Sequence, residues 1–406
     1  MSRETGFTIN KYLPLACIYF FFNSLFLPEG LLYTTFLTPL FFFQIVEQKK
    51  LKYLIFFVSY ISIFFIVHLT LGINITHYLI SYILFTSVGI FCICFYSFCR
   101  NIQSFETLFI NILYINTILI PIALLSLKFN IFKAYFWYLR PISPDLPVIP
   151  RLKMFSYEAS YYSLLLVPIV FYVIWKLIFN LNKLNVFHLL LVIIPLGLSF
   201  SLGVIMGIVI SMFLLILFYS KSLFNNRRVA IISLVMILVL IGGFAFLYKY
   251  FPDNPLITRI KNISTGRDTS ARGRTYEAFQ IAVLIAKEKS LWFGVGLGQI
   301  KDVGRGIISN FYQYMNMPGT VRIPNAVAET FAIYGIIGLI IRFWLIIYLF
   351  IKTKVSSNYF RLSLFLFVFI YQFTGSYLFN IVEFVIWILA FSFIFPQFNR
   401  KEILHE

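Results

Sequence analysis

Long apolar runs separated by short polar connections make up most of the sequence. Twelve runs stand out, at residues 11–27, 31–46, 53–71, 77–98, 105–127, 159–179, 186–200, 202–220, 229–248, 325–351, 358–378 and 380–397. A helix that crosses a bilayer needs about 20 mostly apolar residues, whereas the strands of a membrane barrel alternate apolar and polar positions over about ten. Because these runs are continuously apolar, the pattern predicts an all-α, polytopic integral membrane protein with about 12 transmembrane helices.

Composition also indicates that lipid surrounds most of the chain. Hydrophobic residues make up 60% of the sequence, charged residues only 12%, and the mean hydropathy is +0.89. Soluble proteins carry about 25% charged residues. The first run follows basic residues but lacks the small-residue cleavage site of a signal peptide, so we expect it to remain as the first helix.

The distribution of charge favours a membrane protein over a nucleic-acid-binding one, although the net charge is +18. Cations fall in alternate short connections, and the positive-inside rule makes these connections cytoplasmic. They are Lys49, Lys50, Lys52, Arg100, Lys176, Lys183, Lys221, Arg227, Arg228, Lys352, Lys354, Arg361, Arg400 and Lys401. With twelve helices, both termini are cytoplasmic. The bilayer is the expected partner, and no nucleic acid is expected.

The expected organisation alternates blocks of helices with two outward-facing loops. Helices 1–5 occupy residues 1–127, a first loop 128–158, helices 6–9 residues 159–248, a large loop 249–324, helices 10–12 residues 325–397, and a cytoplasmic tail 398–406. The two loops hold roughly half of all Lys and Arg, which long translocated loops tolerate. Topology permits this concentration of charge but does not explain it.

The large loop is expected to carry structure of its own. Asp268 or Ser270 is placed to cap a helix running through TYEAFQIAVLIAKEKS, whose apolar run is too short to span a bilayer. Basic residues flank it, so we expect a helix at 274–290 along the outer membrane boundary. The following GVGLG (294–298) would allow close backbone approach to a phosphate, although glycine alternation is also common in plain loops.

The outer arginines are the sharpest chemical signal. They are Arg140, Arg151, Arg259, Arg267, Arg272, Arg274, Arg305 and Arg322. A guanidinium group binds phosphate oxygens bidentately, so two or three could hold a pyrophosphate without a metal. The competing interpretation is that these side chains bind anionic lipid headgroups.

Charged residues inside helices are the second signal, because they usually face a cavity or a partner. Glu158 and Glu329 lie near the outer ends of helices six and ten, and Glu383 lies at a comparable depth in helix twelve. Docking of the loop arginines is the alternative role of Glu158 and Glu329. Arg342 is expected nearer the cytoplasmic side, where snorkelling or pairing inside the bundle is favoured over catalysis.

Metal, cysteine and histidine chemistry are not indicated. No outward Asp/Asp or Asp-x-Asp pair is present to hold Mg²⁺, and Cys92 and Cys94 point to different helix faces. We therefore expect no metal and no other cofactor. Histidine is scarce, and only His77 is a candidate neighbour of the outer acids. A carboxylate must therefore act as base, or position alone must activate the acceptor.

Three fragments resemble the O-antigen polymerase and O-antigen ligase superfamily of bacterial membrane glycosyltransferases. RLKMFSYEASYYS (151–163) resembles its Arg…Phe-x-Glu-Pro-Ser-Tyr segment. SARGRTYEAFQIAVLIAKEKSLWFGVGLG (270–298) resembles the Arg and Gly-x-Gly segment of its large periplasmic loop. IPNAVAETFAIYGIIGLI (323–340) resembles its His-Asn-x-x-x-Glu segment opening a late helix. The fragments cover about sixty residues, and their order and spacing are more specific than any one alone.

The resemblance implies a GT-C-like enzyme in the bacterial inner membrane that uses undecaprenyl-pyrophosphate-linked glycans at the periplasmic face. The polymerase branch moves a growing glycan onto a lipid-linked repeat unit, so a lipid-linked oligosaccharide would be both donor and acceptor. Arg151, Arg272 and Arg274 would then sit near the pyrophosphate, and Glu158 and Glu329 would lie in the same cavity. Arg267, Arg322, Asn325 and Tyr161 would support them. A chain-length regulator protein is a further candidate partner.

Two departures from the family pattern separate the possible functions. Ala159 replaces a proline, which implies a local backbone adjustment. Pro324 stands where many members have the histidine on which the ligases depend, so its presence argues for a polymerase over a ligase that transfers glycan to lipid A-core. A flippase or exporter of lipid-linked oligosaccharide is the alternative from another class. It would require charged residues along a central path, and the sequence has few.

The orientation of the large loop can be tested directly. A cysteine introduced at Gly266, in a variant lacking the four native cysteines, should react with a membrane-impermeant maleimide in intact cells. Labelling only after the membrane is permeabilised would place this loop in the cytosol and contradict the predicted topology.

Overall fold

The computed structural model describes the chain as a largely helical protein. It describes residues 13–20, 23–28, 31–102, 104–140, 148–224, 242–243, 245–246, 248–313 and 321–400. The predicted ninth span, 229–248, lies almost entirely outside these residues, as does most of the tail. The chain divides into two compact units.

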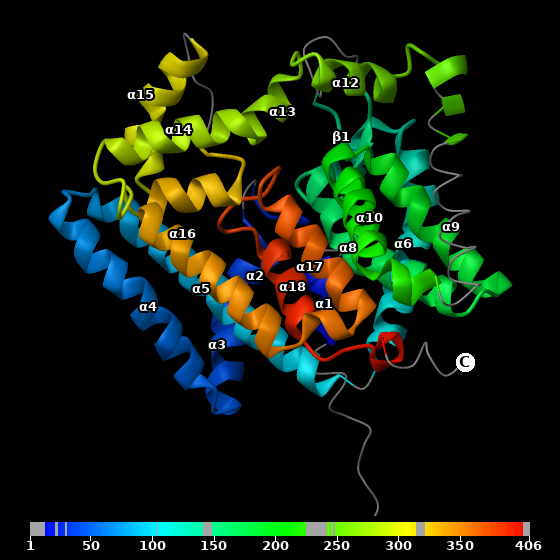
Figure 1. The fold of residues 1–406 in the computed structure, drawn as a ribbon, viewed down its shortest axis with the longest axis horizontal. Coiled ribbons are helices and arrows are strands. Elements are labelled where there is room, and N and C mark those ends of the chain that lie inside the picture. Colours follow the sequence, from blue (N-terminus) through cyan, green and yellow to red (C-terminus); the bar gives the residue numbers. More distant parts are fainter. Residues whose placement is uncertain are drawn as a thin grey trace, which may run out of the picture. The chain divides into compact units, whose positions relative to one another are not determined.

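Unit 1 comprises Met1–Gln103, Gly273–Lys354 and Phe369–Ser392. Its helices, drawn in blue, yellow, orange and red in Figure 1, are α1 (Leu13–Phe20), α2 (Tyr33–Phe36), α3 (Thr38–Glu47), α4 (Leu51–Thr70), α5 (Ile75–Asn101), α14 (Tyr276–Lys287), α15 (Ile300–Tyr312), α16 (Ala326–Lys352) and α18 (Ile381–Phe391). The long α5 packs against α2, α3, α4 and α18, while α14 packs against α15 and α16.

Unit 2 comprises Ser104–Arg272, Val355–Val368 and Phe393–Glu406. Its elements are α6 (Phe105–Ser126), α7 (Asn130–Phe136), β1 (Trp137–Tyr138), β2 (Arg151–Leu152), α8 (Ala159–Phe179), α9 (Lys183–Ser199), α10 (Leu202–Phe224), α12 (Pro255–Ser264), η2 (Val355–Ser357) and η3 (Pro396–Phe398). Two further helices, α13 (Thr269–Arg274) and α17 (Tyr359–Tyr371), cross the boundaries between the units.

Helix α8 is the core of unit 2. In its most apolar stretch, 89% of the residues are buried within the protein, and it packs against both α9 and α10. Its few polar groups are paired, since Tyr162 donates to Asn116 Oδ1 at 2.6 Å and Trp175 Nε1 donates to Ser363 Oγ at 2.8 Å. Paired polar groups are what a helix deep in an apolar interior requires.

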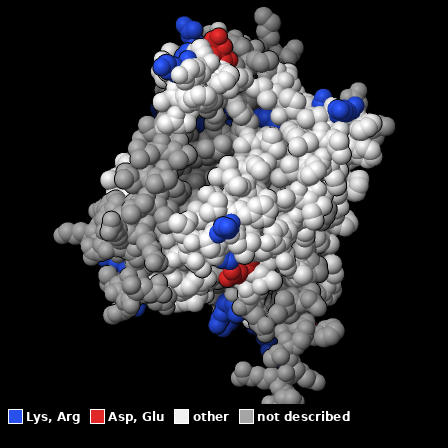
Figure 2. Space-filling view, turned by 90° about the vertical axis from the view of Figure 1, so that its right-hand side faces the viewer, with Lys and Arg blue, Asp and Glu red and all other residues white. Residues whose placement is uncertain are grey.

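Six described helices are long and apolar enough to cross a bilayer: α4, α5, α6, α8, α16 and residues 202–219 of α10. The chain is therefore a multi-pass membrane protein. Large apolar side chains such as Phe56 on α4 and Phe218 on α10 are exposed, as expected for surfaces that face lipid. Figure 2 shows one face of the molecule, where uncharged side chains cover most of the described surface.

The predicted spans agree with the observed helices to different degrees. Runs 53–71, 77–98, 105–127, 159–179 and 202–220 are confirmed as the long helices α4, α5, α6, α8 and α10. Run 186–200 forms the shorter α9. The single helices expected over 11–27 and 31–46 are wrong. Among the described residues of the first run, Leu13–Phe20 are helical and residues 23–27 are not. The second run is interrupted at Leu37, because Pro39 lacks an amide hydrogen and starts a new helix.

The last two predicted spans, 358–378 and 380–397, are also too long. Helix α17 ends at Tyr371 and α18 ends at Phe391. Between them lies the segment QFTGSYLFN, residues 372–380, which we call the α17–α18 turn. Its polar residues and glycine were included in an apolar run because the average hydropathy of the run is high.

The tenth predicted span contains the main irregularity of unit 1. Helix α16 is broken at Gly335, which has φ 66° and ψ −161°, a conformation open essentially to glycine alone. At a break, the carbonyls of Ala332 and Ile333 lose the amides of Ile336 and Ile337, their ordinary partners four residues on. Four backbone groups must then find partners elsewhere.

The segment before α15 supplies all four partners. Val295 N donates to Ala332 O at 2.9 Å and Gly296 N donates to Ile333 O at 3.0 Å. In turn, Leu291 O accepts from Ile336 N at 3.0 Å and Trp292 O accepts from Ile337 N at 3.1 Å. Residues 291–296 therefore replace the missing turn of the helix.

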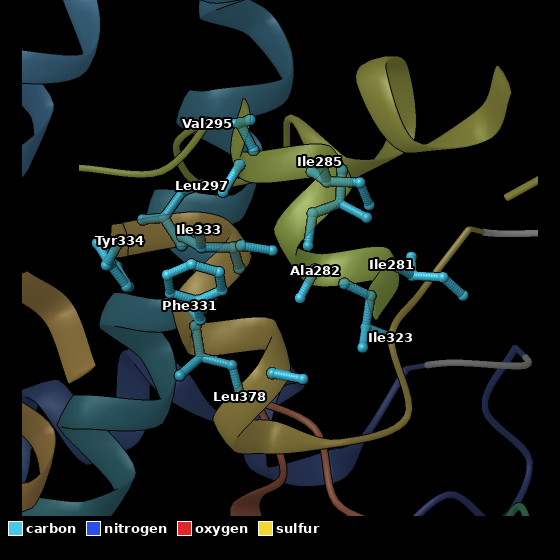
Figure 3. Close-up of a cluster of buried hydrophobic side chains, with 14 of the residues drawn as sticks. Ile281, Ala282, Ile285, Val295, Leu297, Ile323, Phe331, Ile333, Tyr334 and Leu378 are labelled. Atoms are coloured by element: carbon cyan, nitrogen blue, oxygen red, sulfur yellow. The ribbon is translucent and has the colours of Figure 1, made fainter. Parts of the chain in front are cut away.

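Backbone and side chains both contribute to this contact. A Cβ atom on Gly294 would lie 2.4 Å from the Ile333 carbonyl, so only glycine allows the approach. Val295 and Leu297 are fully buried, together with side chains from α14 and α16 (Figure 3). The apolar stripe of α14 faces this cluster, so it is covered by protein. These apolar side chains are therefore not available to contact lipid, and the predicted position of residues 274–290 at the membrane boundary stays a prediction.

Replacing Gly335 by alanine should disrupt the hydrogen-bonded contact between residues 291–296 and α16. Its Cβ would lie 2.3 Å from the Trp292 carbonyl group, and the backbone conformation would be strained. We expect a loss of about 3 kcal/mol of stability, measured as thermal unfolding in detergent. Gly306→Ala is the matched control, because Gly306 lies in α15 with nothing within 4 Å of its Cβ position. Equal stability of the two variants would contradict the backbone contact.

Candidate functional site

The side chain of Asn325 links the start of α16 to two other segments by hydrogen bonds. Asn325 is fully buried and caps the helix, its Oδ1 accepting from Ala328 N at 2.9 Å. Its Nδ2 donates to Arg274 O at 2.9 Å and to Phe373 O at 2.6 Å. The predicted supporting residue thus joins the end of α13, the start of α16 and the α17–α18 turn. Its amide is engaged entirely within the protein.

Glu329, the first predicted catalytic residue, lies one turn further along α16. Its side chain is only 6% exposed. Oε2 accepts from Leu378 N of the α17–α18 turn at 2.6 Å. The cations of Arg322 and Arg342 and the anion of Glu383 all act on this carboxylate electrostatically. A buried acid surrounded by fixed charges is a frequent feature of functional sites.

The side chain of Arg342 reaches the start of α16, beside Glu329, although the sequence places the two residues far apart along one helix. Its NH1 donates to Thr330 Oγ1 at 3.1 Å, although twelve residues of straight helix would separate the two by about 18 Å. The break at Gly335 removes that separation. The prediction that Arg342 pairs inside the bundle is confirmed, because NH2 donates to Glu383 Oε1 at 2.8 Å.

Glu383 in turn binds groups from α18 and the α17–α18 turn. Its Oε2 accepts a short hydrogen bond from Ser376 Oγ, and its Oε1 accepts from Trp387 Nε1 at 3.3 Å. Gln372 Oε1 accepts from both Arg342 Nε and NH2, at 3.1 and 3.0 Å. We call Arg342, Glu383, Gln372, Thr330 and Ser376 the Arg342 network.

Two predicted arginines of unit 1 reach the same turn. Arg322 is exposed, and its guanidinium carbon lies 5.6 Å from the centre of the Tyr377 ring. Arg274 NH1 lies 3.6 Å from the position that a Cβ of Gly375 would occupy. The α17–α18 turn therefore gathers Arg274, Arg322 and Glu329 around it.

Unit 2 holds the other predicted residues on two segments, the first of which follows a short hairpin. Arg151 is buried in β2, opposite Tyr138 of β1, and its guanidinium lies 4.9 Å from that ring. Glu158 precedes the first residue of α8, and its Oε1 accepts from Ser160 Oγ at 2.5 Å. Tyr161 is buried beside Tyr157, with ring centres 4.6 Å apart.

The second segment, STGRDTSARGR, belongs to unit 2 up to Arg272 and is organised by an ion pair that sequence reasoning missed. Asp268 is buried, accepts from Arg259 Nε at 3.2 Å and caps α13 by accepting from Ala271 N at 2.8 Å. Arg267 is exposed, and Arg272 NH1 donates to Gly266 O at 3.3 Å. The cap at Asp268 is confirmed, but the expected single helix is two, broken at Thr275 between α13 and α14.

The glycine-rich segment 294–298 has little freedom to bind phosphate. The amides of Gly294, Val295 and Gly296 already donate to protein carbonyls, and its glycines permit the contact with α16. Its role as a structural loop is thus favoured. His77, the one histidine that the sequence offered as a neighbour of the outer acids, bonds through Nδ1 to Asp302 Oδ2 at 2.8 Å, on the exposed ends of α5 and α15.

The residues that sequence reasoning missed lie chiefly in the α17–α18 turn. Gln372 and Ser376 belonged to a predicted span, and nothing in the local pattern linked them to Arg342 or Glu383. The available signal was the interruption of run 358–378 by three polar residues and a glycine. Such a cluster is unusual inside a spanning helix.

Comparison with known proteins finds a similarity over part of the chain. Residues 186–343 match the family model described as O-antigen ligase. The segment includes Arg267, Arg272, Arg274, Asn325 and Glu329, and ends just after Arg342. A comparison with curated proteins found no match.

Within this multi-pass membrane protein, residues 186–343 are therefore similar to the O-antigen polymerase and ligase superfamily. Members of this family are membrane glycosyltransferase-like enzymes.

The role of Asn325 can be tested by replacing its side-chain amide nitrogen with oxygen. Asn325→Asp keeps the capping oxygen but replaces both donated hydrogens by an anion facing two carbonyl oxygens. We expect a loss of about 3 kcal/mol in thermal unfolding, since unpaired buried groups are costly. Asn182→Asp is the control, because exposed Asn182 caps α9 through Oδ1 alone, at 2.7 Å from Asn185 N. If both variants lose the same amount of stability, the two hydrogen bonds that Asn325 Nδ2 donates contribute nothing to the stability of the protein.

Proposed function

We propose that this protein is a polysaccharide repeat-unit polymerase acting at the periplasmic face of the bacterial inner membrane. It would move a growing glycan from undecaprenyl pyrophosphate to a lipid-linked repeat unit. The observation that carries this proposal is the buried Glu329 at the start of α16, with Arg274 and Arg322 at the same turn, in a segment matched by the family model.

The chemistry requires little beyond position and charge. The acceptor hydroxyl oxygen attacks the anomeric carbon of the donor sugar and gives its proton to a carboxylate. The bond from that carbon to the pyrophosphate oxygen breaks, and its electron pair leaves with the pyrophosphate. Arginines that stabilise the departing charge, and a base that receives the proton, account for the whole step. No metal is needed in this scheme.

Glu329 is the better candidate base of the two predicted acids. It is buried beside the α17–α18 turn, which Arg274 and Arg322 also reach, whereas Glu158 is half-buried at the start of α8 and bonded to Ser160. The predicted catalytic role of Glu158 rests on the family resemblance alone. Arg272 and Arg274 would hold the leaving pyrophosphate, assisted by Arg151.

A ligase is the second candidate, because the matched family model is described as O-antigen ligase. A ligase would transfer the glycan to lipid A-core instead of another repeat unit. Pro324 weighs against it, since a proline side chain cannot act as an acid or base.

The decisive assay offers purified protein a lipid-linked repeat unit alone, and then with lipid A-core. Lengthening without lipid A-core is expected from a polymerase. Transfer only to lipid A-core would identify a ligase, and transfer to neither would reject both assignments.

Neutral variants test the proposed residues in the same assay. Arg272→Gln and Arg274→Gln should each lower the rate of lengthening about 10²-fold, because each removes charge stabilisation from the leaving group. Arg151→Gln should lower it less. Arg100→Gln, at the exposed end of α5, is the matched control. Full lengthening by a well-expressed triple variant would reject the pyrophosphate role of these arginines.

A further inference from the structure

We propose that Arg342 and Glu383 are positioning residues, which hold the α17–α18 turn so that Glu329 faces the acceptor hydroxyl in a fixed place. This inference rests on the proposed role of Glu329 as the base. Neither residue belongs to the fragments that resemble the family's site.

Burying the ion pair of Arg342 and Glu383 is costly, and hydrogen bonds satisfy its charged groups. The side chains of Arg342 and Glu383 are 15% and 6% exposed, and their charged atoms are 2.8 Å apart. The three guanidinium nitrogens of Arg342 all donate, to Gln372, Thr330 and Glu383. Replacing a buried ion pair by apolar side chains is often neutral or stabilising, so stability alone is a weak reason for its presence.

The Arg342 network reaches Glu329 by two short routes. Thr330, which accepts from Arg342, is the next residue after Glu329 on the same turn of α16. The other route runs through the α17–α18 turn, which the network fixes at Gln372 and Ser376. Two residues beyond Ser376, Leu378 N donates to Glu329 Oε2 at 2.6 Å.

Charge balance fits the same role. The charged atoms of Arg342 and Glu383 lie 2.8 Å apart. Glu383 offsets Arg342, so the network contributes geometry with little net charge at the base. Proton transfer from the acceptor hydroxyl depends on that geometry, because a displacement of about 1 Å can slow a positioned reaction about 10²-fold.

The first test is a double-mutant cycle on the rate of glycan transfer. Arg342→Gln should lower kcat about 10²-fold with KM for the acceptor little changed, while Arg342→Lys should recover part of the rate. In a Glu329→Gln background, Arg342→Gln should cause no further loss, because the network acts through Glu329. The same pattern is expected for Glu383→Gln.

The control is a partly exposed ion pair in unit 2. Lys176 Nζ lies 2.5 Å from Glu106 Oε1, and Glu106→Gln should leave kcat unchanged. The positioning role would be overturned if Arg342→Gln lowered kcat by the same factor in the native protein and in the Glu329→Gln variant. It would also be overturned if Glu106→Gln lowered kcat as much as Glu383→Gln.

Hydrogen exchange at the Leu378 amide separates this inference from the proposed function. This amide should exchange slowly in the native protein and at least about tenfold faster in Arg342→Gln and Glu383→Gln, but not in Glu106→Gln. Protein that transfers glycan to neither acceptor would refute the function, and fast exchange in the variants would still support the positioning of the turn. Unchanged exchange would overturn the positioning in either case.

Discussion

A backbone amide or carbonyl inside a membrane protein must find a partner, and this requirement organises unit 1. The break at Gly335 releases two amides and two carbonyls, and residues 291–296 pair with all four. Without that segment, the break would expose polar backbone where water is scarce. The glycines at 294 and 335 permit the approach, since a Cβ at either would collide with backbone.

The break also determines which side chains meet. An unbroken α16 would hold Glu329 and Arg342 about 20 Å apart along the helix axis. In the observed helix, Arg342 reaches Thr330, and through Glu383 and Gln372 it reaches the α17–α18 turn. The same turn binds Glu329 and Asn325. One glycine conformation therefore brings the second half of α16 to the acid at its start.

How far the sequence predicted the structure depended on the kind of interaction. Run 159–179 coincides with α8 because an unbroken apolar segment of about 20 residues has few alternatives in a membrane. The break in run 325–351 was not predicted, because its cause lies forty residues earlier in a loop. Hydropathy averaged over run 358–378 also concealed Gln372 and Ser376, whose partners are distant in sequence. The motif-based choice of Glu329 found a buried carboxylate among cations, but Arg259 and Asp268, which organise the arginine-rich stretch, carry no local signature.

The pairing of residues 291–296 with α16 uses main-chain atoms, whereas the buried side chains of Ala332 and Ile333 pack in the apolar cluster around it. The hydrogen bonds therefore constrain the path of the backbone and leave the choice of side chain to packing alone, so glycine is required at 294 and 335 for a reason that hydropathy does not record.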